Sequence, residues 1–378
     1  MTRAAVLAFA ALVVLALVSE RADAYPQYQL SHDQTCTGCH LSPAGGNLLN
    51  ENGLAAAESM SQFGTAPEFF YGKLGTPDWL HLGGDLRGST GFIQTPEKIL
   101  AAFPMQIELY ATAKFGSFTI HTNFASRPSQ FGNVAATSVW AREHYVMWQQ
   151  KADEGSGLFV RLGRFMPVFG LRYAEHPLYT RRFGGVPLYG DTYGLHVAYI
   201  DPKFEAHATG FIEDPLISPV VHDSGGAVYA EYRITERFQA GAEAMVTRSD
   251  DDKKFRYGVT AKLHIPEAKL LLQTEFQFYN QVINTTPTNP VGGAPVQIVG
   301  NVIGTITLND FLQLDLGIGY YNTNIRISEL DRECGDINLR YALTSHVELQ
   351  LNSRLEMFRF GKGGPTAAYA LGQLHYRL

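Results

Sequence analysis

The sequence predicts an all-β protein: an antiparallel outer-membrane β-barrel of about sixteen strands, with a small α-helical segment at its N-terminus. Three observations support this fold class. From residue 79 to the last residue, apolar and polar residues alternate with a period of two. The connections between the alternating segments are by turns short and long, as in outer-membrane barrels. The chain contains 19 Tyr, 23 Phe and 37 Gly, which suit aromatic girdles and tight strand contacts.

Residues 1–24 are predicted to be a secretory signal peptide. Arg3 supplies a positive start, the run AAVLAFAALVVLALV is apolar, and ADA at 22–24 offers small residues for cleavage. The apolar run is too short for a membrane anchor. We therefore expect an exported bacterial protein whose mature chain begins at Tyr25.

Residues 25–78 form a separate unit. The stretch SPAGGNLLNENG is rich in turn formers, and residues 54–64 are predicted to form a short helix that ends at Gly64. A Pro/Gly-containing linker follows up to residue 78. Because about fifty residues hold little core of their own, we expect this unit either to lie below the barrel or to plug its lumen.

Residues 79–378 are predicted to form the barrel. In 105–115, for example, Ile107 and Leu109 share one face while Glu108 and Thr112 share the other. The predicted strands are 79–92, 103–115, 117–127, 139–150, 157–168, 188–200, 204–213, 225–235, 237–248, 254–265, 268–281, 297–308, 311–323, 335–344, 346–360 and 367–378. Polar faces that hold charges at mid-strand favour a membrane barrel over a soluble sandwich.

The loop between the fifth and sixth strands contains RYAEHPLYTRR. In general sixteen-strand porins the loop at this position folds into the lumen and narrows it, and by analogy this loop is expected to do the same. The alternative is an ordinary exposed loop.

The charge distribution excludes some partners and leaves others open. The net charge is −6 and no strongly basic stripe is present, so nucleic acid is not expected as a partner. Acidic residues gather in predicted outer loops and would attract cations or would simply be solvated loop tips: Asp250, Asp251, Asp252, Glu329, Asp331 and Glu333.

The run TCTGCH at 35–40 predicts covalent attachment of one haem c. Two residues between Cys36 and Cys39 give the thiols the separation needed for two thioether bonds, and His40 is placed to be the proximal iron ligand. A redox pair or half a zinc site are the alternatives, but a second Cys pair is missing. Cys334, the third cysteine, is predicted to be a lone thiol.

The distal iron ligand has two candidates. Met60 is the tentative choice because it lies on the helix predicted after the motif, and its alternative role is to pack on the haem edge. His81 enters the lumen with the first strand and is the alternative ligand. His32 lies too near Cys36 to reach over the ring.

This combination resembles the fused cytochrome–porins, outer-membrane iron(II) oxidases in which a monohaem segment is joined to a barrel. The likeness of architecture covers the mature chain. The motif likeness comprises Cys36, Cys39 and His40, followed by a Leu-Asn-x-x-Gly run at Leu49, Asn50 and Gly53, whereas SPAGG departs from the family's Phe-Pro-type run.

The resemblance implies an iron(II) oxidase-like electron-transfer protein in the outer-membrane lipid. It implies extracellular iron(II) as the donor and a periplasmic c-type cytochrome as the acceptor. Outward electron flow, a haem-bearing diffusion porin and a haem enzyme such as a peroxidase are the alternatives.

Overall fold

We describe the fold from a computed structural model of the chain. The structure describes residues 28–31, 34–46, 48–95, 97–127, 138–152, 154–175, 177–187, 190–215, 223–250, 252–283, 295–359 and 365–378. The predicted signal peptide, His32 and Asp251 lie outside these residues.

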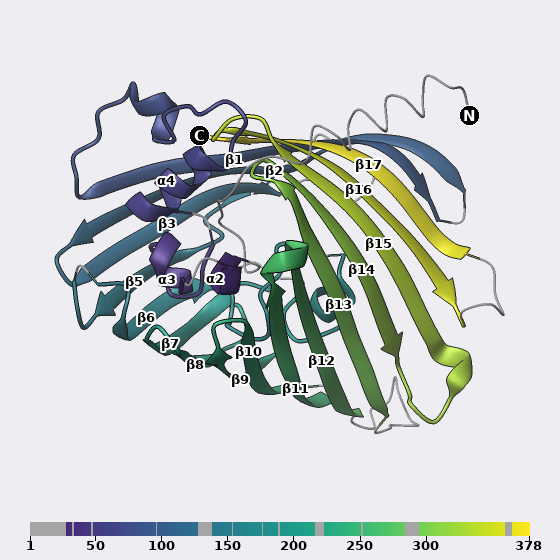
Figure 1. Ribbon diagram of the computed structural model, residues 1–378. Helices are drawn as coiled ribbons and strands as arrows, with labels where there is room; N and C mark the ends of the chain where they lie inside the picture. The colour runs from purple at the N-terminus through teal and green to yellow at the C-terminus, as the bar shows by residue number, and fades with distance from the viewer. Residues whose placement is uncertain are drawn as a thin grey trace, which may run out of the picture.

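The described strands close into one antiparallel barrel (Figure 1). They are β1 (Leu80–Gln94), β2 (Lys98–Phe115), β3 (Phe118–Arg127), β4 (Ser138–Trp140), β5 (His144–Gln149), β6 (Gly157–Phe165), β7 (Thr192–Ile200), β8 (Phe204–Phe211), β9 (Ser224–Thr235), β10 (Phe238–Arg248), β11 (Asp252–Ile265), β12 (Leu270–Ile283), β13 (Val296–Asn309), β14 (Leu312–Asn322), β15 (Asp331–Ala342), β16 (Val347–Phe358) and β17 (Pro365–Arg377).

The register of the ends shows that the sheet is closed. Asp85 of β1 lies opposite Arg377 of β17 and also opposite Glu108 of β2. The short β4 and β5 both pair with β3, at Ala125 and at Thr122, and so share one strand position. Sixteen strand positions result, which confirms the predicted fold class.

Side-chain burial shows that the barrel is apolar outside and polar inside. In β2, Ile107 and Leu109 are 45% and 49% exposed, whereas Glu108 and Thr112 are 1% and 2% exposed. Strand β10 repeats the pattern, with Val246 exposed and Gln239, Glu243 and Thr247 buried. A soluble protein would bury the apolar set instead, so this arrangement matches a barrel whose outer wall faces lipid.

The helices of the chain are short. They are α2 (Tyr28–Ser31), α3 (Cys36–Cys39), α4 (Glu51–Ser59), α5 (Tyr179–Arg182) and the 3₁₀ turns η1 (Phe69–Gly72), η2 (Pro266–Ala268) and η3 (Ser328–Leu330). None of the helices described is long and apolar enough to cross a membrane.

Helix α4 begins and ends earlier than the predicted range of 54–64. Its N-cap is Asn50, whose side-chain oxygen accepts a hydrogen bond from Gly53 N at 3.0 Å. At the other end, the Ser59 and Ser61 hydroxyls donate to the carbonyls of Ala56 and Glu58, which ends the helix before Gly64. Capping therefore shifts the boundary.

The loop between β6 and β7 folds into the lumen, which decides between the two predicted roles of this loop. Its helix α5 contacts β12, β13 and β14 on the far wall. Tyr179 is fully buried and packs with Val299 and Tyr321, and Asn301 donates a 2.7 Å hydrogen bond to Thr180. The loop therefore crosses and narrows the lumen, and we call residues 166–191 the constriction loop.

Candidate functional site

The N-terminal segment lies in the barrel mouth at the end formed by short turns. Figure 1 shows α2, α3 and α4 inside the barrel, with α4 beside the C-terminus of the chain. The Thr37 hydroxyl donates to the carbonyl of Gly155 in the β5–β6 connection. On the opposite side, the Gln62 and Phe63 amides donate to carbonyls of Ala342 and Leu343 at 3.0 Å. We call residues 28–60 the plug.

The Cys-x-x-Cys-His run forms one helical turn that is held by the chain after it. His40 N donates to Cys36 O at 2.9 Å, so the turn closes at the histidine. Asn50 binds this turn twice: its backbone N donates to Cys39 O, and its side-chain amide donates to Thr37 O, each at 2.9 Å. His40 also forms an isolated antiparallel bridge with Leu49. The Leu49 and Asn50 of the predicted motif thus fix the orientation of the run.

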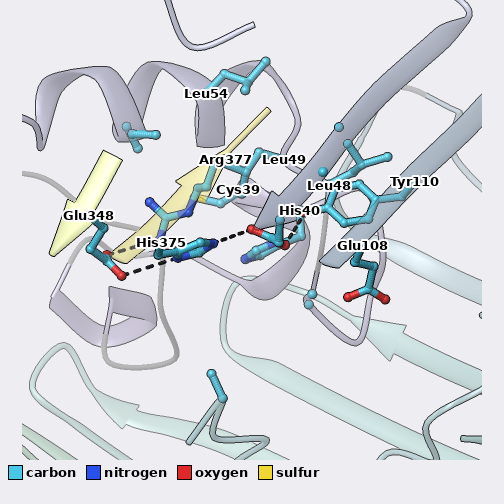
Figure 2. Close-up of a pocket in the computed structure, with 18 of the residues that line it drawn as sticks. Cys39, His40, Leu48, Leu49, Leu54, Glu108, Tyr110, Glu348, His375 and Arg377 are labelled. Atoms are coloured by element: carbon cyan, nitrogen blue, oxygen red, sulfur yellow. Dashed lines mark hydrogen bonds and ion pairs between the residues drawn. The ribbon is translucent and has the colours of Figure 1, made fainter. Parts of the chain in front are cut away.

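All five sequence-predicted site residues line one cavity of about 810 Å³ inside the barrel mouth: Cys36, Cys39, His40, Met60 and His81. This volume lies within the range of about 300–1,000 Å³ typical of ligand and cofactor sites. Figure 2 shows Cys39 and His40 beside the apolar side chains of Leu48 and Leu49. The wall beyond them is formed by residues of β1, β2, β3, β6, β14, β15, β16, β17 and the constriction loop.

Burial keeps His40 and Cys36 of the motif in their neutral forms. Burial lowers the pKa of His40 to about 4, and its Nδ1 is buried with no hydrogen-bond partner among the described residues. A neutral imidazole is the form that binds a metal ion. Burial also raises the pKa of the Cys36 thiol to about 12, which is opposite to the lowered pKa of redox-active cysteines.

These observations fit a covalent haem c. Two cysteine side chains and a neutral histidine line one cavity, which has apolar residues for a macrocycle on the plug side. Cys36 and Cys39 would hold the group by thioether bonds and His40 would bind its iron.

The structure brings both distal candidates to the cavity without choosing between them. Met60 is the half-buried C-cap of α4, and His81 is a half-buried residue of β1 paired with Thr112. Each therefore stays a prediction.

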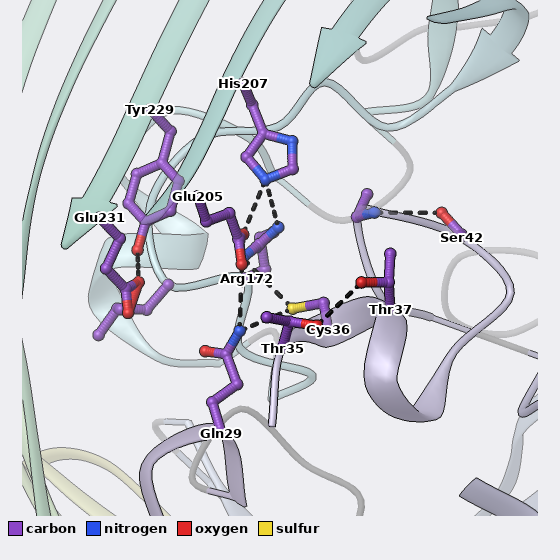
Figure 3. A network of polar contacts seen from close by, with 12 residues as sticks. Gln29, Thr35, Cys36, Thr37, Ser42, Arg172, Glu205, His207, Tyr229 and Glu231 are labelled. Carbon is purple, nitrogen blue, oxygen red and sulfur yellow. Dashed lines mark hydrogen bonds and ion pairs between the residues drawn. The ribbon is translucent and has the colours of Figure 1, made fainter. Parts of the chain in front are cut away.

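A buried polar network fastens the plug to the lumen wall, and Figure 3 shows it around Cys36. The Cys36 sulfur accepts hydrogen bonds from Gln29 Nε2 at 2.9 Å and from Arg172 Nη2 at 3.6 Å. Arg172 of the constriction loop forms an ion pair with Glu205 of β8, and Gln29 Nε2 donates to the same carboxylate at 3.3 Å. His207 completes the set with a 2.7 Å contact to Glu205 Oε1.

A second anchor lies next to this network on β9 and β11. Lys262 forms an ion pair with Glu231 at 2.6 Å and donates to Gln29 Oε1 at 2.5 Å. Arg233 Nη2 donates to the carbonyls of Gln29 and Gln34 at 3.2 Å. The sequence signal for these residues was their charge on the polar face of predicted strands, but that signal did not pair them with the plug.

Residues outside the cavity have other roles. Cys334 is a free buried thiol that packs with Tyr179 under the constriction loop, in agreement with the predicted lone thiol. Several acidic residues of the outer loops have partners: Glu329 pairs with Arg359 at 3.3 Å, and Asp331 accepts from Tyr320 at 2.6 Å. These two carboxylates therefore already interact with neighbouring side chains of their own loops.

Comparison with solved structures places the barrel among porins. OmpF of Salmonella typhi, in complex with daunomycin, has a TM-score of 0.61 at 11% identity, over 79% of this chain and 97% of its own. OmpT of Vibrio cholerae has a TM-score of 0.58 at 11% identity, over 81% and 100%. The channel DcaP of Acinetobacter baumannii has a TM-score of 0.55 at 12% identity, over 79% and 97%. No protein-family profile and no curated protein matches the chain. These likenesses show that the chain has the fold of outer-membrane porins.

Proposed function

We propose that this chain is an outer-membrane electron-transfer protein with one covalent haem c. Cys36 and Cys39 attach the group inside the barrel mouth, and His40 is the proximal ligand. The observation that carries the proposal is that these three residues and both distal candidates line the same cavity.

The protein's own residues would set the conditions for electron transfer. The apolar outer wall suits the lipid of an outer membrane, and the strand ladder separates the cavity from that lipid. The plug and the constriction loop both lie in the lumen and contact each other through Arg172 and Cys36. The haem, when bound, supplies one-electron chemistry whose potential depends on axial ligand, burial and nearby charge.

The most economical assignment of partners is extracellular iron(II) as donor and a periplasmic c-type cytochrome as acceptor. One haem handles one electron, which suits the iron(II)/iron(III) couple. In that case the chain is an iron(II) oxidase-like oxidoreductase. Outward transfer to an extracellular acceptor uses the same residues and differs only in the potentials of the partners.

The test is a haem stain followed by rapid mixing. The wild-type chain, made in cells that mature c-type cytochromes, should stain for haem on a denaturing gel, and the double variant Cys36→Ala with Cys39→Ala should not. Oxidised wild-type protein mixed with iron(II) should be reduced in a bimolecular phase. An unstained wild-type band would end the haem assignment, and reduction by low-potential donors alone would leave outward transfer.

A diffusion porin is the second candidate, because the similar solved structures are porins. High ion conductance of the purified full chain in planar bilayers would favour it. Low conductance is expected instead, since the plug and constriction loop both lie in the lumen.

A further inference from the structure

Most arginines of the lumen are paired with carboxylates. The ion pairs are Arg142–Asp191 and Arg164–Asp214 at 2.8 Å, Arg340–Asp315 at 2.7 Å, Arg354–Asp336 at 2.6 Å, Arg377–Glu348 at 3.1 Å and Arg172–Glu205. Such pairing is the usual solution for a buried charge.

Among the described residues, three guanidinium groups of the cavity wall depart from this rule. Arg161, Arg181 and Arg87 line the cavity and have no carboxylate within 4 Å. Of these, Arg161 is buried, whereas Arg181 and Arg87 are half-buried. An unpaired buried guanidinium is costly, so a partner absent from the polypeptide is expected at such a group.

Arg161 is the buried group of this set, and two of its three guanidinium nitrogens have no hydrogen-bond partner among the described residues. It is 2% exposed, and its guanidinium stacks on Phe165 at 4.0 Å and on Tyr145 at 4.9 Å from the ring centres. Its hydrogen-bonding neighbours are hydroxyl groups, with Nη1 donating to Ser42 Oγ at 3.4 Å and the Tyr145 phenol nearby, and the Glu143 carboxylate acts on it electrostatically without forming an ion pair. Nε and Nη2 are buried and have no hydrogen-bond partner among the described residues.

The position of Arg161 connects it to the haem motif. Ser42, which Arg161 contacts, lies two residues after His40, and Arg161 and His40 both line the cavity. A c-type haem has two propionate carboxylates besides its two thioether links. Buried carboxylates need cationic partners, and a guanidinium matches a carboxylate with two parallel N–H groups.

We infer that Arg161 is the ion-pair partner of a haem propionate and thereby a residue that positions the haem and sets its potential. This inference rests on the proposed function. Both terminal nitrogens of Arg181 donate to Met166 Sδ, at 3.3 and 3.4 Å. Arg181 belongs to the constriction loop rather than to the wall beside the motif. Arg161 is therefore assigned first.

The assignment has a measurable electrostatic consequence. In Arg161→Gln one positive charge beside the haem is lost, and electron uptake becomes less favourable. The carboxylate without its partner also takes up a proton more readily, since it is buried. Reduction of the iron by one electron is then accompanied by uptake of one proton on that carboxylate, and the midpoint potential falls as pH rises.

The experiment compares full-length wild type, Arg161→Gln, Arg161→Lys, Arg181→Gln and Arg256→Gln by spectroelectrochemical titration between pH 6 and 9, after the haem content of each has been measured. Arg256 is a matched control: it is buried in β11, its Nε lacks a partner among the described residues, it stacks on Tyr279 at 4.4 Å, and it does not line the cavity.

We expect Arg161→Gln to lower the equilibrium constant for reduction at least tenfold, which is about 59 mV for one electron, and to introduce pH dependence. Arg161→Lys should recover most of the potential but shift the propionate bending band in resonance Raman spectra. Arg256→Gln should change neither quantity. If Arg161→Gln fails to fold, the Raman band of Arg161→Lys decides.

Two results would overturn the inference. The first is full haem content with an unchanged potential and Raman band in the Arg161 variants. The second is a shift in Arg181→Gln but not in Arg161→Gln. Neither result touches the proposed function, which fails separately if the wild-type chain has no covalent haem.

Discussion

Gly53 is the position at which the smallest substitution should disturb the motif most. It lies in the first turn of α4, directly against the Cys-x-x-Cys-His turn. A Cβ added to Gly53 would stand less than 3.0 Å from Cys39 O and 3.0 Å from Leu49 Cβ. Ordinary Cβ contacts begin at 3.4 Å, and the nearest obstacle is a backbone oxygen that no rotamer change can move.

Two opposing effects determine how much Gly53→Ala changes the stability of the plug. Ala is favoured over Gly inside a helix by about 0.8–1.0 kcal/mol. Overpacking costs roughly 1–3 kcal/mol and reaches the upper end where backbone must shift. The clash should win, and we expect the plug to lose about 1–2 kcal/mol of stability.

The assay is urea unfolding of the plug, followed by Soret circular dichroism of the full-length protein. For a small unit with a denaturant slope of about 1 kcal/mol per M, the midpoint should fall by about 1–2 M. Gly64→Ala is the control, because its Cβ would meet only the flexible Glu58 side chain at 3.7 Å. Equal midpoints for wild type and Gly53→Ala would refute the packing argument.

Three further predictions concern the ligands, the anchor and the lumen. Met60→Ala should abolish the methionine–iron charge-transfer band. If the wild type instead has a bis-histidine spectrum and His81→Ala becomes high-spin, His81 is the distal ligand. Glu205→Gln leaves the largely buried Arg172, whose side chain is 15% exposed, without its carboxylate and should cost about 3 kcal/mol, seen as a lower urea midpoint of the plug; a midpoint within error of wild type would contradict the anchoring role. Deletion of residues 28–60 should raise single-channel conductance severalfold in planar bilayers, and equal conductance would mean that the plug does not obstruct the lumen.

The barrel was predictable from the sequence because strand alternation is a local property. Whether a residue such as Glu108 faces the lumen or the lipid follows from its parity relative to Leu109, and the register across a closed sheet keeps that parity. The position of the constriction loop was less predictable, since an exposed loop would have a similar composition. Its position inside the barrel depends on contacts such as Tyr179 with Val299, which are 120 residues apart in the chain.

The candidate site likewise has one part that was predictable from the sequence and one part that was not. Cys36, Cys39 and His40 are neighbours in the sequence, so their spacing by itself predicted haem attachment, and a helical turn is enough to bring them together. The groups that face them come from distant strands: Glu205 is separated from Gln29 by 176 residues and Lys262 from Gln29 by 233. Many strand charges were available for these contacts. Tertiary structure decided among them, because the position of the plug against particular strands determines which buried charges meet and which, like Arg161, have no carboxylate among the described residues within ion-pair distance.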